Sequence, residues 1–335
     1  MRVLVAGAAG LIGSHLVDAL LGRGDEVVAV DNFVTGRPDN LTRASADPRC
    51  SVMVADICEP LPPTGPIDAV CHLASPDSPR DVDRLGLEIL HIGSEGTLRL
   101  LELASLHHAR FLLASTSEVY GEPEEHPQRE DYRGNVSTTG PRACFDEARR
   151  FAEAAASTFE RQFEVEMRIA RIFNTYGPRM RPDDGRVVSN LIVEALKGEP
   201  LTVHGDGSQT RSLCYVDDQV RGLLALLDSD VRGPVNIGSD EETTIAELAQ
   251  LIARIVGVAP TVDRRPIPTD YTTRRRPSLD RAHRLLGWSP IVPLKTGLAR
   301  TVDWFRAELS ASESAPAHVG HKGSTPDRLA EDRIA

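Results

Sequence analysis

The chain has 335 residues, of which 41% are hydrophobic and 26% charged, and its formal net charge is −11. This is an ordinary globular composition, with room for one large domain or a domain with a second lobe. The negative charge argues against a nucleic-acid partner, and no apolar run approaches the length of a membrane span.

Short apolar runs alternate with helical patterns in the first half of the chain. The runs are continuously hydrophobic, which is typical of parallel strands covered on both faces. The pattern predicts an α/β fold, a Rossmann-type doubly wound parallel sheet with a smaller C-terminal α/β substrate lobe. The predicted strands are residues 2–6, 26–31, 51–55, 69–73, 110–115 and 166–173, and the predicted long helices are residues 83–106 and 142–163.

After Asn174, prolines and glycines divide the sequence into smaller pieces. We assign residues 1–174 to the sheet domain, to which parts of the later chain return, and residues 175–309 to a nucleotide- and substrate-binding lobe. Residues 310–335 are rich in Ser, Ala and charge without periodicity, and they predict a disordered tail. The helices expected in the lobe are residues 188–197, 216–227, 245–255 and 294–307.

The five cysteines have no C-x-x-C spacing, so we expect reduced thiols and no metal site. The first strand begins at Arg2, which leaves no room for a signal or transit peptide, and we expect a cytoplasmic protein. Only three of the 38 basic residues are lysines. An arginine at a position where a lysine is expected is therefore weak evidence for a change of function in this chain.

Gly7, Gly10 and Gly13 lie between the first strand and a predicted helix. Glycines let the backbone approach a pyrophosphate, and the helix N-terminus offers it free N–H groups. Asp31 ends the second strand, where a carboxylate can accept both ribose hydroxyls and would repel a 2′-phosphate. This spacing favours NAD over NADP, with Asp56 near the adenine, whereas Arg37 is the one nearby residue that suits NADP. The alternative is a glycine-rich turn that serves packing alone.

Longer motifs continue along the chain to about residue 307. They are LLASTSEVYG at 112–121, HPQ at 126–128, GPRAC at 140–144, ARIFNTYGPRM at 170–180, DGRVVSN at 184–190, GDGSQTR at 205–211, RRRP at 274–277 and LGW at 286–288. Together with the glycine loop they resemble the extended short-chain dehydrogenase/reductase superfamily (the NAD-dependent epimerase/dehydratase family), and most closely its UDP-glucuronate decarboxylase branch.

The resemblance implies an NAD-dependent enzyme that modifies a sugar nucleotide or a nucleoside by epimerisation, dehydration or decarboxylation. A decarboxylase cycle would oxidise C4, lose CO2 from the β-keto acid and reduce C4. The resemblance also implies a homodimer formed through the two long helices. The implied NAD contacts are Gly7, Gly10, Leu11, Ile12, Gly13, Asp31, Asn32, Asp56, Ile57, Leu73, Ala74 and Arg149, and the implied nucleotide contacts are Asn174, Val188, Arg211, Asn236 and Arg275.

Two positions depart from the family's catalytic pair, a Tyr and a Lys four residues apart on one helix face. Phe145 stands at the tyrosine position and Arg149 at the lysine position. A phenyl ring has no titratable proton and cannot act as a general base. A guanidinium can still donate to ribose hydroxyls, although its planar fork differs from a point charge.

Further departures lie in the same segments. Residues 137–139 read Ser-Thr-Thr where the family has Asn-Pro-Ile, Val82 replaces a tyrosine, and Gly93 replaces an asparagine. The cofactor loop, Asp31 and the diphosphate arginines keep the pattern. We therefore expect a rebuilt sugar pocket and a changed substrate or reaction, typical of specialised metabolism. The alternative is a catalytically silent NAD- and nucleotide-binding partner of an active homologue.

Thr116 and Glu118 are the residues that we expect to carry the chemistry in place of the tyrosine. Thr116 ends the fifth strand, where the family has a hydroxyl that contacts the reacting group. Glu118 could abstract a proton if burial raised its pKa. Arg211 completes the predicted catalytic set as a diphosphate ligand, while His72 and Cys144 are expected to be structural.

Overall fold

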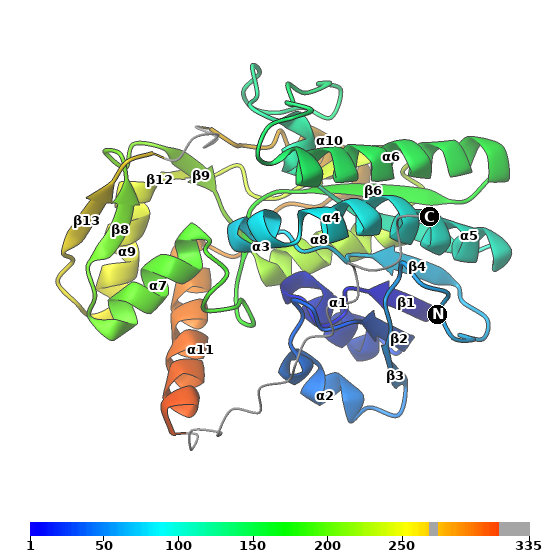
Figure 1. The fold of residues 1–335 in the computed structure, drawn as a ribbon, viewed down its shortest axis with the longest axis horizontal. Helices are drawn as coiled ribbons and strands as arrows, with labels where there is room; N and C mark the ends of the chain where they lie inside the picture. The colour runs from blue at the N-terminus through cyan, green and yellow to red at the C-terminus, as the bar shows by residue number, and fades with distance from the viewer. Residues whose placement is uncertain (268–273, 315–335) are drawn as a thin grey trace, which may run out of the picture.

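The computed structural model describes residues 1–267 and 274–314. A seven-stranded sheet in the order β11-β6-β5-β4-β1-β2-β3 forms the centre of the molecule (Figure 1), and every neighbouring pair in it is parallel. The predicted Rossmann-type α/β fold is confirmed. The strands are β1 Arg2–Ala6, β2 Glu26–Asp31, β3 Cys50–Val54, β4 Ala69–His72, β5 Arg110–Thr116, β6 Met167–Ile172 and β11 Pro234–Ile237.

Six of these strands match the predicted runs to within a residue or two, but β11 was not predicted. It is only four residues long, and it pairs with β6 from the later part of the chain. The prediction that all strands are covered on both faces is wrong for β3, where Val52 and Val54 are 38% and 71% exposed. This strand ends the sheet, so it lacks the neighbours that bury the central strands.

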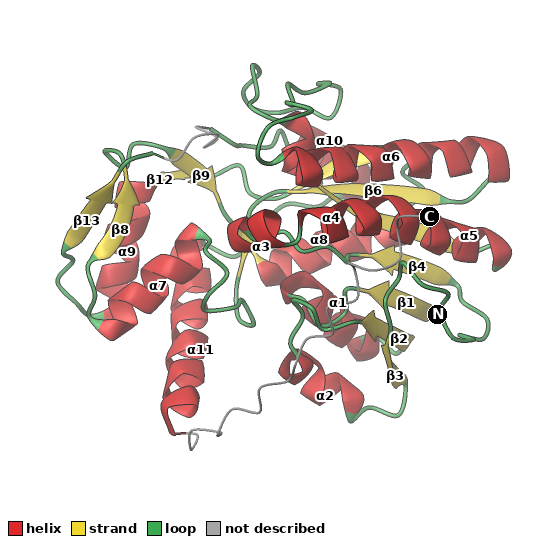
Figure 2. Cartoon of the chain, viewed as in Figure 1, coloured by secondary structure: helices red, strands yellow, loops and turns green. Residues whose placement is uncertain are grey.

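Helices cover both faces of the sheet (Figure 2). Alternate residues of β1 enter different cores, because Val3 and Val5 pack with α1 and α8 whereas Leu4 and Ala6 pack with α5 and α6. We expected α8 in the lobe, but it packs against α1 and β6 and belongs to the sheet domain. The helices of these layers are α1 Leu11–Gly22, α2 Thr42–Ser45, α8 Val216–Asp228, α5 Thr97–Leu106 and α6 Ala143–Phe163.

The helix predicted over residues 83–106 is not continuous. It consists of α3 Pro79–Arg84, α4 Gly86–His91, a π-helical turn Ile92–Gly96 and α5. The turn lies against α6, where a Cβ atom at Gly93 would be 2.6 Å from the Cβ of Ala148. The asparagine that the family has at this position would therefore not fit beside Ala148.

The remaining segments form a smaller lobe with paired short strands. Among the described residues the predicted lobe helices are present at α7, α9 and α11, but α11 continues to Ser314, beyond the predicted start of the tail; residues 315–335 lie outside the described part. The lobe elements are α7 Val187–Lys197, β8 Leu201–His204, β9 Thr210–Ser212, β12 Glu242–Thr244, α9 Ile245–Val256, β13 Val262–Arg265 and α11 Leu294–Ser314. The connecting elements are β7 Thr175–Tyr176, β10 Cys214–Tyr215 and α10 Asp280–Leu286.

Within residues 1–267 and 274–314, none of the helices has the length and apolar character needed to cross a membrane.

The contact between Gly93 and Ala148 yields a stability test. Gly93→Ala should lower the free energy of unfolding by about 1–3 kcal/mol, because the added methyl group overpacks the interface with α6. Adding Ala148→Gly should recover part of this loss, which a double-mutant cycle in urea would measure. Gly22→Ala is the matched control, since nothing lies within 4 Å of a Cβ atom there. Additive effects of the two changes would contradict the direct contact.

Candidate active site

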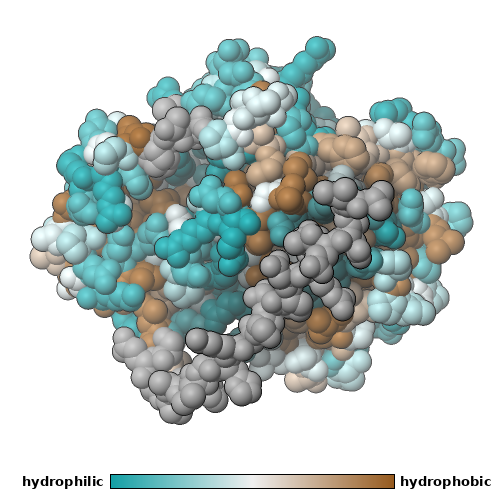
Figure 3. All heavy atoms as spheres, viewed as in Figure 1, coloured by the Kyte–Doolittle hydropathy of each residue, from teal (hydrophilic) through white to brown (hydrophobic). Residues whose placement is uncertain are grey.

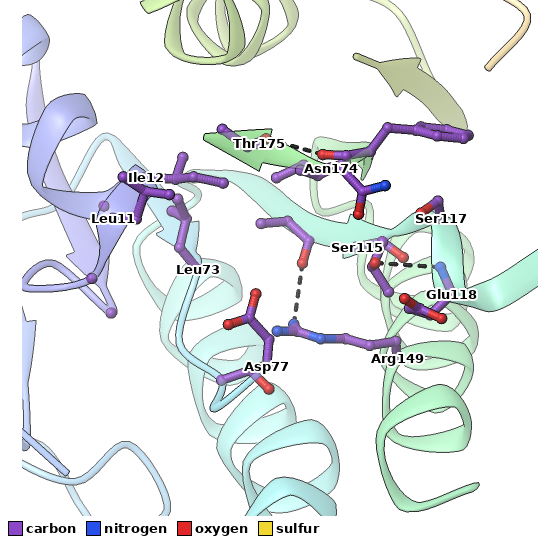
Figure 4. Close-up of a pocket in the computed structure, with 18 of the residues that line it drawn as sticks. Leu11, Ile12, Leu73, Asp77, Ser115, Ser117, Glu118, Arg149, Asn174 and Thr175 are labelled. Carbon is purple, nitrogen blue, oxygen red and sulfur yellow. Dashed lines mark hydrogen bonds between the residues drawn. The ribbon is translucent and has the colours of Figure 1, made fainter. Parts of the chain in front are cut away.

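Two adjoining cavities open at the carboxyl ends of the strands, the usual ligand position in such sheets. Gly7, Gly10, Leu73 and Ser75 line both of them. The first cavity also meets the end of β5 and the start of α6, and Figure 4 shows Thr175, Asn174, Glu118 and Arg149 around it. The second lies beside the ends of β2 and β3.

The glycine loop brings β1, α1 and the segment after β4 unusually close. Gly7 has a φ of +80°, and a Cβ atom there would lie 2.6 Å from the backbone nitrogen of Ala74. A Cβ atom at Gly13 would lie 2.0 Å from the Gly7 carbonyl oxygen. Only glycine allows this approach, which leaves the N-terminus of α1 open to a pyrophosphate.

Asp31 lies at the tip of β2 and lines the second cavity. Its carboxylate accepts hydrogen bonds of 2.8 Å from the Ala9 and Phe33 backbone N–H groups, which fix its orientation. Burial raises the pKa of this carboxyl. The residue that suited NADP, Arg37, is directed elsewhere: its guanidinium pairs with Glu308 on α11. The local geometry therefore fits NAD.

All twelve residues predicted to contact NAD line one or the other cavity. Gly7, Gly10 and Leu73 line both; Leu11, Ile12, Gly13 and Arg149 line the first; Asp31, Asn32, Asp56, Ile57 and Ala74 line the second. The sequence analysis missed the loop after β2, where Val34, Thr35 and Gly36 join the second cavity. A glycine at residue 36 was the available signal, because a Cβ atom there would lie 2.7 Å from an Asp31 carboxylate oxygen.

The two unusual catalytic positions contact each other. Phe145 is 3% exposed, and the Arg149 guanidinium carbon lies 5.7 Å from the centre of its ring, within cation–π range. Arg149 donates to the Ala114 carbonyl at 3.1 Å and points toward Asp77 in Figure 4. Burial lowers the pKa of Arg149 to about 10, so it remains charged at neutral pH.

Thr116 and Glu118 both line the first cavity. The Glu118 N–H donates to the Thr116 hydroxyl oxygen at 3.3 Å. Arg275 donates two hydrogen bonds to the Glu118 carboxylate, one of 2.8 Å and one shorter. A guanidinium nitrogen of Arg142 lies 3.4 Å from a Glu118 carboxylate oxygen. Burial alone would raise the pKa of Glu118. The positive charges of Arg275 and Arg142 outweigh this effect, so the pKa of Glu118 is lowered. Our condition for Glu118 as a base, a raised pKa, is therefore not met.

Most of the departures from the family lie in one place. Val82, Ile89, Phe145 and Ala148 form one buried apolar cluster, and Gly93 packs against Ala148. Residues 137–139 do not belong to it, because they are exposed in the loop before α6. The sequence analysis placed all these changes at the sugar pocket, and for the loop this stays a prediction.

The predicted nucleotide ligands do not all reach the cavity. Asn174 lines the first cavity. Arg275 does not line it but binds Glu118, which does. Val188 is buried in the core at the start of α7. Arg211 lies on β9, paired with β12, and contributes to lowering the pKa of Glu118.

Asn236 is wholly buried, which corrects its predicted contact with the nucleotide. Its side chain accepts from the Tyr120 hydroxyl at 2.7 Å and donates to the carbonyls of Gln128 and Ser278. Its amide is thus fully used inside the protein. By contrast, Arg186, which the sequence analysis missed, lines the cavity and binds Asp77 at 2.7 Å.

His72 and Cys144 occupy structural positions, as predicted. His72 is wholly buried and hydrogen-bonds the Thr97 hydroxyl at 3.0 Å. Burial lowers its pKa to about 3, so it stays neutral. Cys144 packs against the apolar cluster. In the described part of the chain, no group of His, Cys, Asp or Glu side chains is arranged to hold a metal ion.

The sequence profile of the NAD dependent epimerase/dehydratase family matches residues 3–238. The chain belongs to this family. NAD is the family's cofactor, and the glycine loop and Asp31 fit it. UDP-glucuronic acid decarboxylase 1 of Danio rerio is 49% identical over 92% of this chain and 73% of that protein, and its Arabidopsis thaliana counterpart is 47% identical over 91% and 70%.

Solved structures of the family share the fold. UDP-glucose 4-epimerase of Thermotoga maritima with UDP-glucose has a TM-score of 0.84 at 29% identity, covering 92% of this chain and 100% of that one. UDP-glucuronic acid 4-epimerase of Bacillus cereus with UDP-glucuronic acid and NAD has 0.82, at the same identity and coverage. Its tyrosine-to-phenylalanine variant, in complex with UDP-4-deoxy-4-fluoro-glucuronic acid and NAD, has 0.81, again at 29% identity and the same coverage.

Cofactor preference tests the role of Asp31. The protein should bind NAD(H) more tightly than NADP(H) in calorimetric titration, because the carboxylate repels a 2′-phosphate. Asp31→Ala should weaken NAD binding by about 1–3 kcal/mol, the value of hydrogen bonds to a charged group. Asp39→Ala, which removes an exposed carboxylate from the nearby 3-10 helix Pro38–Leu41, should leave the affinity unchanged. Tighter NADP binding by the unaltered protein would refute the assignment.

Proposed function

We propose that this protein is an NAD-dependent enzyme that decarboxylates UDP-glucuronic acid or a closely related UDP-linked uronic acid. The observation that carries the proposal is the identity of 45–49% with UDP-glucuronic acid decarboxylases, which extends over more than 90% of the chain. The arginines around the first cavity support it, because Arg149 and Arg186 line the cavity and Arg142 and Arg275 pair with Glu118 in its wall.

When bound, NAD would accept a hydride from the sugar and return it. The protein's own residues bind and orient the sugar. The Thr116 hydroxyl, at the end of β5, lines the cavity and would hydrogen-bond the reacting hydroxyl. Arg149 supplies donors to the ribose and a fixed positive charge, while Arg275 and Glu118 present a charged pair to the uronate end.

Phe145 is the main difference between this site and the catalytic site of the family, which has a tyrosine at this position. A phenyl ring cannot move a proton, so another group must do so. The Bacillus cereus variant supports the view that a phenylalanine is compatible with a bound nucleotide sugar and NAD in this fold. The contact of Phe145 with Arg149, together with the apolar cluster behind it, favours a rebuilt site over random decay.

Product analysis tests the proposal. The protein is incubated with NAD and one nucleotide sugar at a time: UDP-glucuronic acid, UDP-glucose or TDP-glucose. The products are separated by chromatography, and their masses are measured by mass spectrometry. Loss of CO2 from UDP-glucuronic acid is the expected result. An unchanged mass with a new retention time would indicate an epimerase, loss of water a dehydratase, and no turnover of any substrate would overturn an enzymatic role.

Site variants give a second test on the identified substrate. Glu118→Gln and Thr116→Val should each lower turnover at least about tenfold, since the first leaves Arg275 with a neutral partner and the second removes the hydroxyl. Restoring the family pair with Phe145→Tyr and Arg149→Lys should help little or harm, because the surrounding positions have changed with Phe145 and the new hydroxyl would lack its partner. A gain of about 10²–10⁴-fold would instead show a decarboxylase that has simply lost its base.

We also propose a homodimer that buries α4 and α6. These helices pack side by side and expose apolar residues, with Leu87 73%, Leu90 40% and Phe151 43% exposed. Figure 3 shows apolar surface in this region of the molecule. A second copy with the same face would cover these side chains in a twofold arrangement. Ala155 and Phe159 of α6 pack against the protein's own core and do not belong to this face. The cytoplasmic location remains a prediction from sequence.

Light scattering tests the dimer at micromolar protein. The unaltered protein should give a dimer mass, and Leu87→Glu with Phe151→Glu should give a monomer, because the charges cannot be buried without partners. Val54→Glu is the matched control, since Val54 is 71% exposed on the sheet edge far along the sequence from these helices. A monomer mass for the unaltered protein would refute the proposal.

A further inference from the structure

Arg186 lines the first cavity, and its guanidinium contacts two carboxylates. It donates a hydrogen bond of 3.0 Å to Asp184 and forms an ion pair of 2.7 Å with Asp77. Asp77 lines the same cavity. The proposed reaction gives this aspartate no role, although it brings a negative charge into a cavity that would receive an anionic substrate.

The two carboxylates that contact Arg186 are held differently. The Asp184 side chain is 4% exposed, and it also accepts hydrogen bonds from the Arg186 backbone N–H at 2.9 Å and from the Ser189 hydroxyl at 2.5 Å. The Asp77 side chain is 53% exposed, and Arg186 is its one ion-pair partner among the described residues. A half-exposed ion pair contributes little to stability, so Asp77 is the carboxylate that a ligand can displace.

A second guanidinium faces the Asp77 carboxylate. Figure 4 shows Asp77 beside Arg149, whose guanidinium points toward it. Burial lowers the pKa of Arg149 to about 10, and the negative charge of Asp77 acts against this shift. Positive charges thus converge on the position of the Asp77 carboxylate, and such a position suits a carboxylate or a phosphate of a ligand.

We propose that Asp77 is an internal competitor of the substrate: its carboxylate occupies the place on Arg186 that an anionic group of the nucleotide sugar takes, and binding displaces it. A UDP-linked uronic acid carries two such groups, the sugar carboxylate and the diphosphate, and both can pair with a guanidinium. The identity of this ligand rests on the proposed function. Breaking the contact with Asp77 opposes binding, so the aspartate weakens substrate affinity and favours release of the product.

Removing the charge of Asp77 should leave the neighbouring segments in place. Arg181 forms an ion pair of 2.8 Å with Asp81, whose side chain is 5% exposed, and donates to the Ser78 hydroxyl at 3.3 Å. Arg186 also donates to the backbone carbonyl of Asp77 at 3.1 Å, a contact that Asp77→Asn retains. These contacts hold the segment after β4 against the segment before α7, so Asp77→Asn isolates the effect of the charge.

Calorimetric titration with nucleotide sugars tests the competition. The protein is loaded with NADH, which cannot accept a hydride, so that binding is measured without turnover. Asp77→Asn should bind UDP-glucuronic acid at least about threefold more tightly, because no ion pair has to be broken. Arg186→Gln should bind it at least about tenfold more weakly, because a charged donor is lost. Unchanged or weaker binding by Asp77→Asn would overturn the proposal.

UDP-glucose, which lacks the sugar carboxylate, identifies the anionic group. A gain in Asp77→Asn for UDP-glucuronic acid alone assigns the place on Arg186 to the carboxylate, and a gain for both sugars assigns it to the diphosphate. The gain should largely disappear when Asp77→Asn is combined with Arg186→Gln. A gain of full size in that double variant would contradict the role of Arg186.

Asp183→Asn is the matched control, because it removes a carboxylate that is 71% exposed on the same segment as Arg186 and lines neither cavity. It should leave both affinities unchanged, and an equal gain there would reduce the effect of Asp77 to overall charge and overturn the competition. The expected affinities in a protein that releases no CO2 would overturn the proposed function alone. Release of CO2 with unchanged affinity in Asp77→Asn would overturn the competition alone.

Discussion

The ion pair between Glu118 and Arg275 joins the end of β5 to a segment more than 150 residues later in the chain. Both side chains are largely buried, so neither could stay charged there without the other. The pair therefore fixes where the later chain crosses the sheet domain. It also places a paired carboxylate in the wall of the first cavity, because Glu118 lines that cavity and binds Arg275.

A second set of contacts supports that arrangement from behind the cavity. Arg171 on β6 binds Glu153 on α6 at 2.8 Å and the Tyr120 hydroxyl at 3.0 Å. Tyr120 in turn donates to Asn236, which β11 carries. Because these polar groups satisfy one another inside the protein, they hold α6, β6 and β11 in register. Phe145 and Arg149 thus lie on a helix whose position is fixed by its hydrogen bonds to β6.

The sequence predicted the cofactor half of the site better than the sugar half, for physical reasons. An NAD site needs glycines at fixed spacing for the pyrophosphate and a carboxylate at the end of the next strand for the ribose. These requirements are local in sequence, so Gly7, Gly13 and Asp31 predict the site. The charge state of Glu118 depends on Arg275, which no spacing rule connects to it. The burial of Asn236 depends likewise on β11, a strand too short to stand out. The π-helical turn that contains Gly93 lies against Ala148, a partner on another helix that no local spacing rule reveals.

The ion pair of Arg37 with Glu308 connects the adenosine side of the cofactor site to the last helix. Arg37 follows the loop that lines the second cavity, and Glu308 lies near the end of α11 as the structure describes it. A dinucleotide that immobilises this loop therefore also restrains the C-terminal helix, and thermodynamic linkage makes the effect mutual. Amide hydrogens of α11 should then exchange more slowly in the holo protein, although the helix lines neither cavity. Through this ion pair, α11 would report cofactor occupancy at a distance from the site.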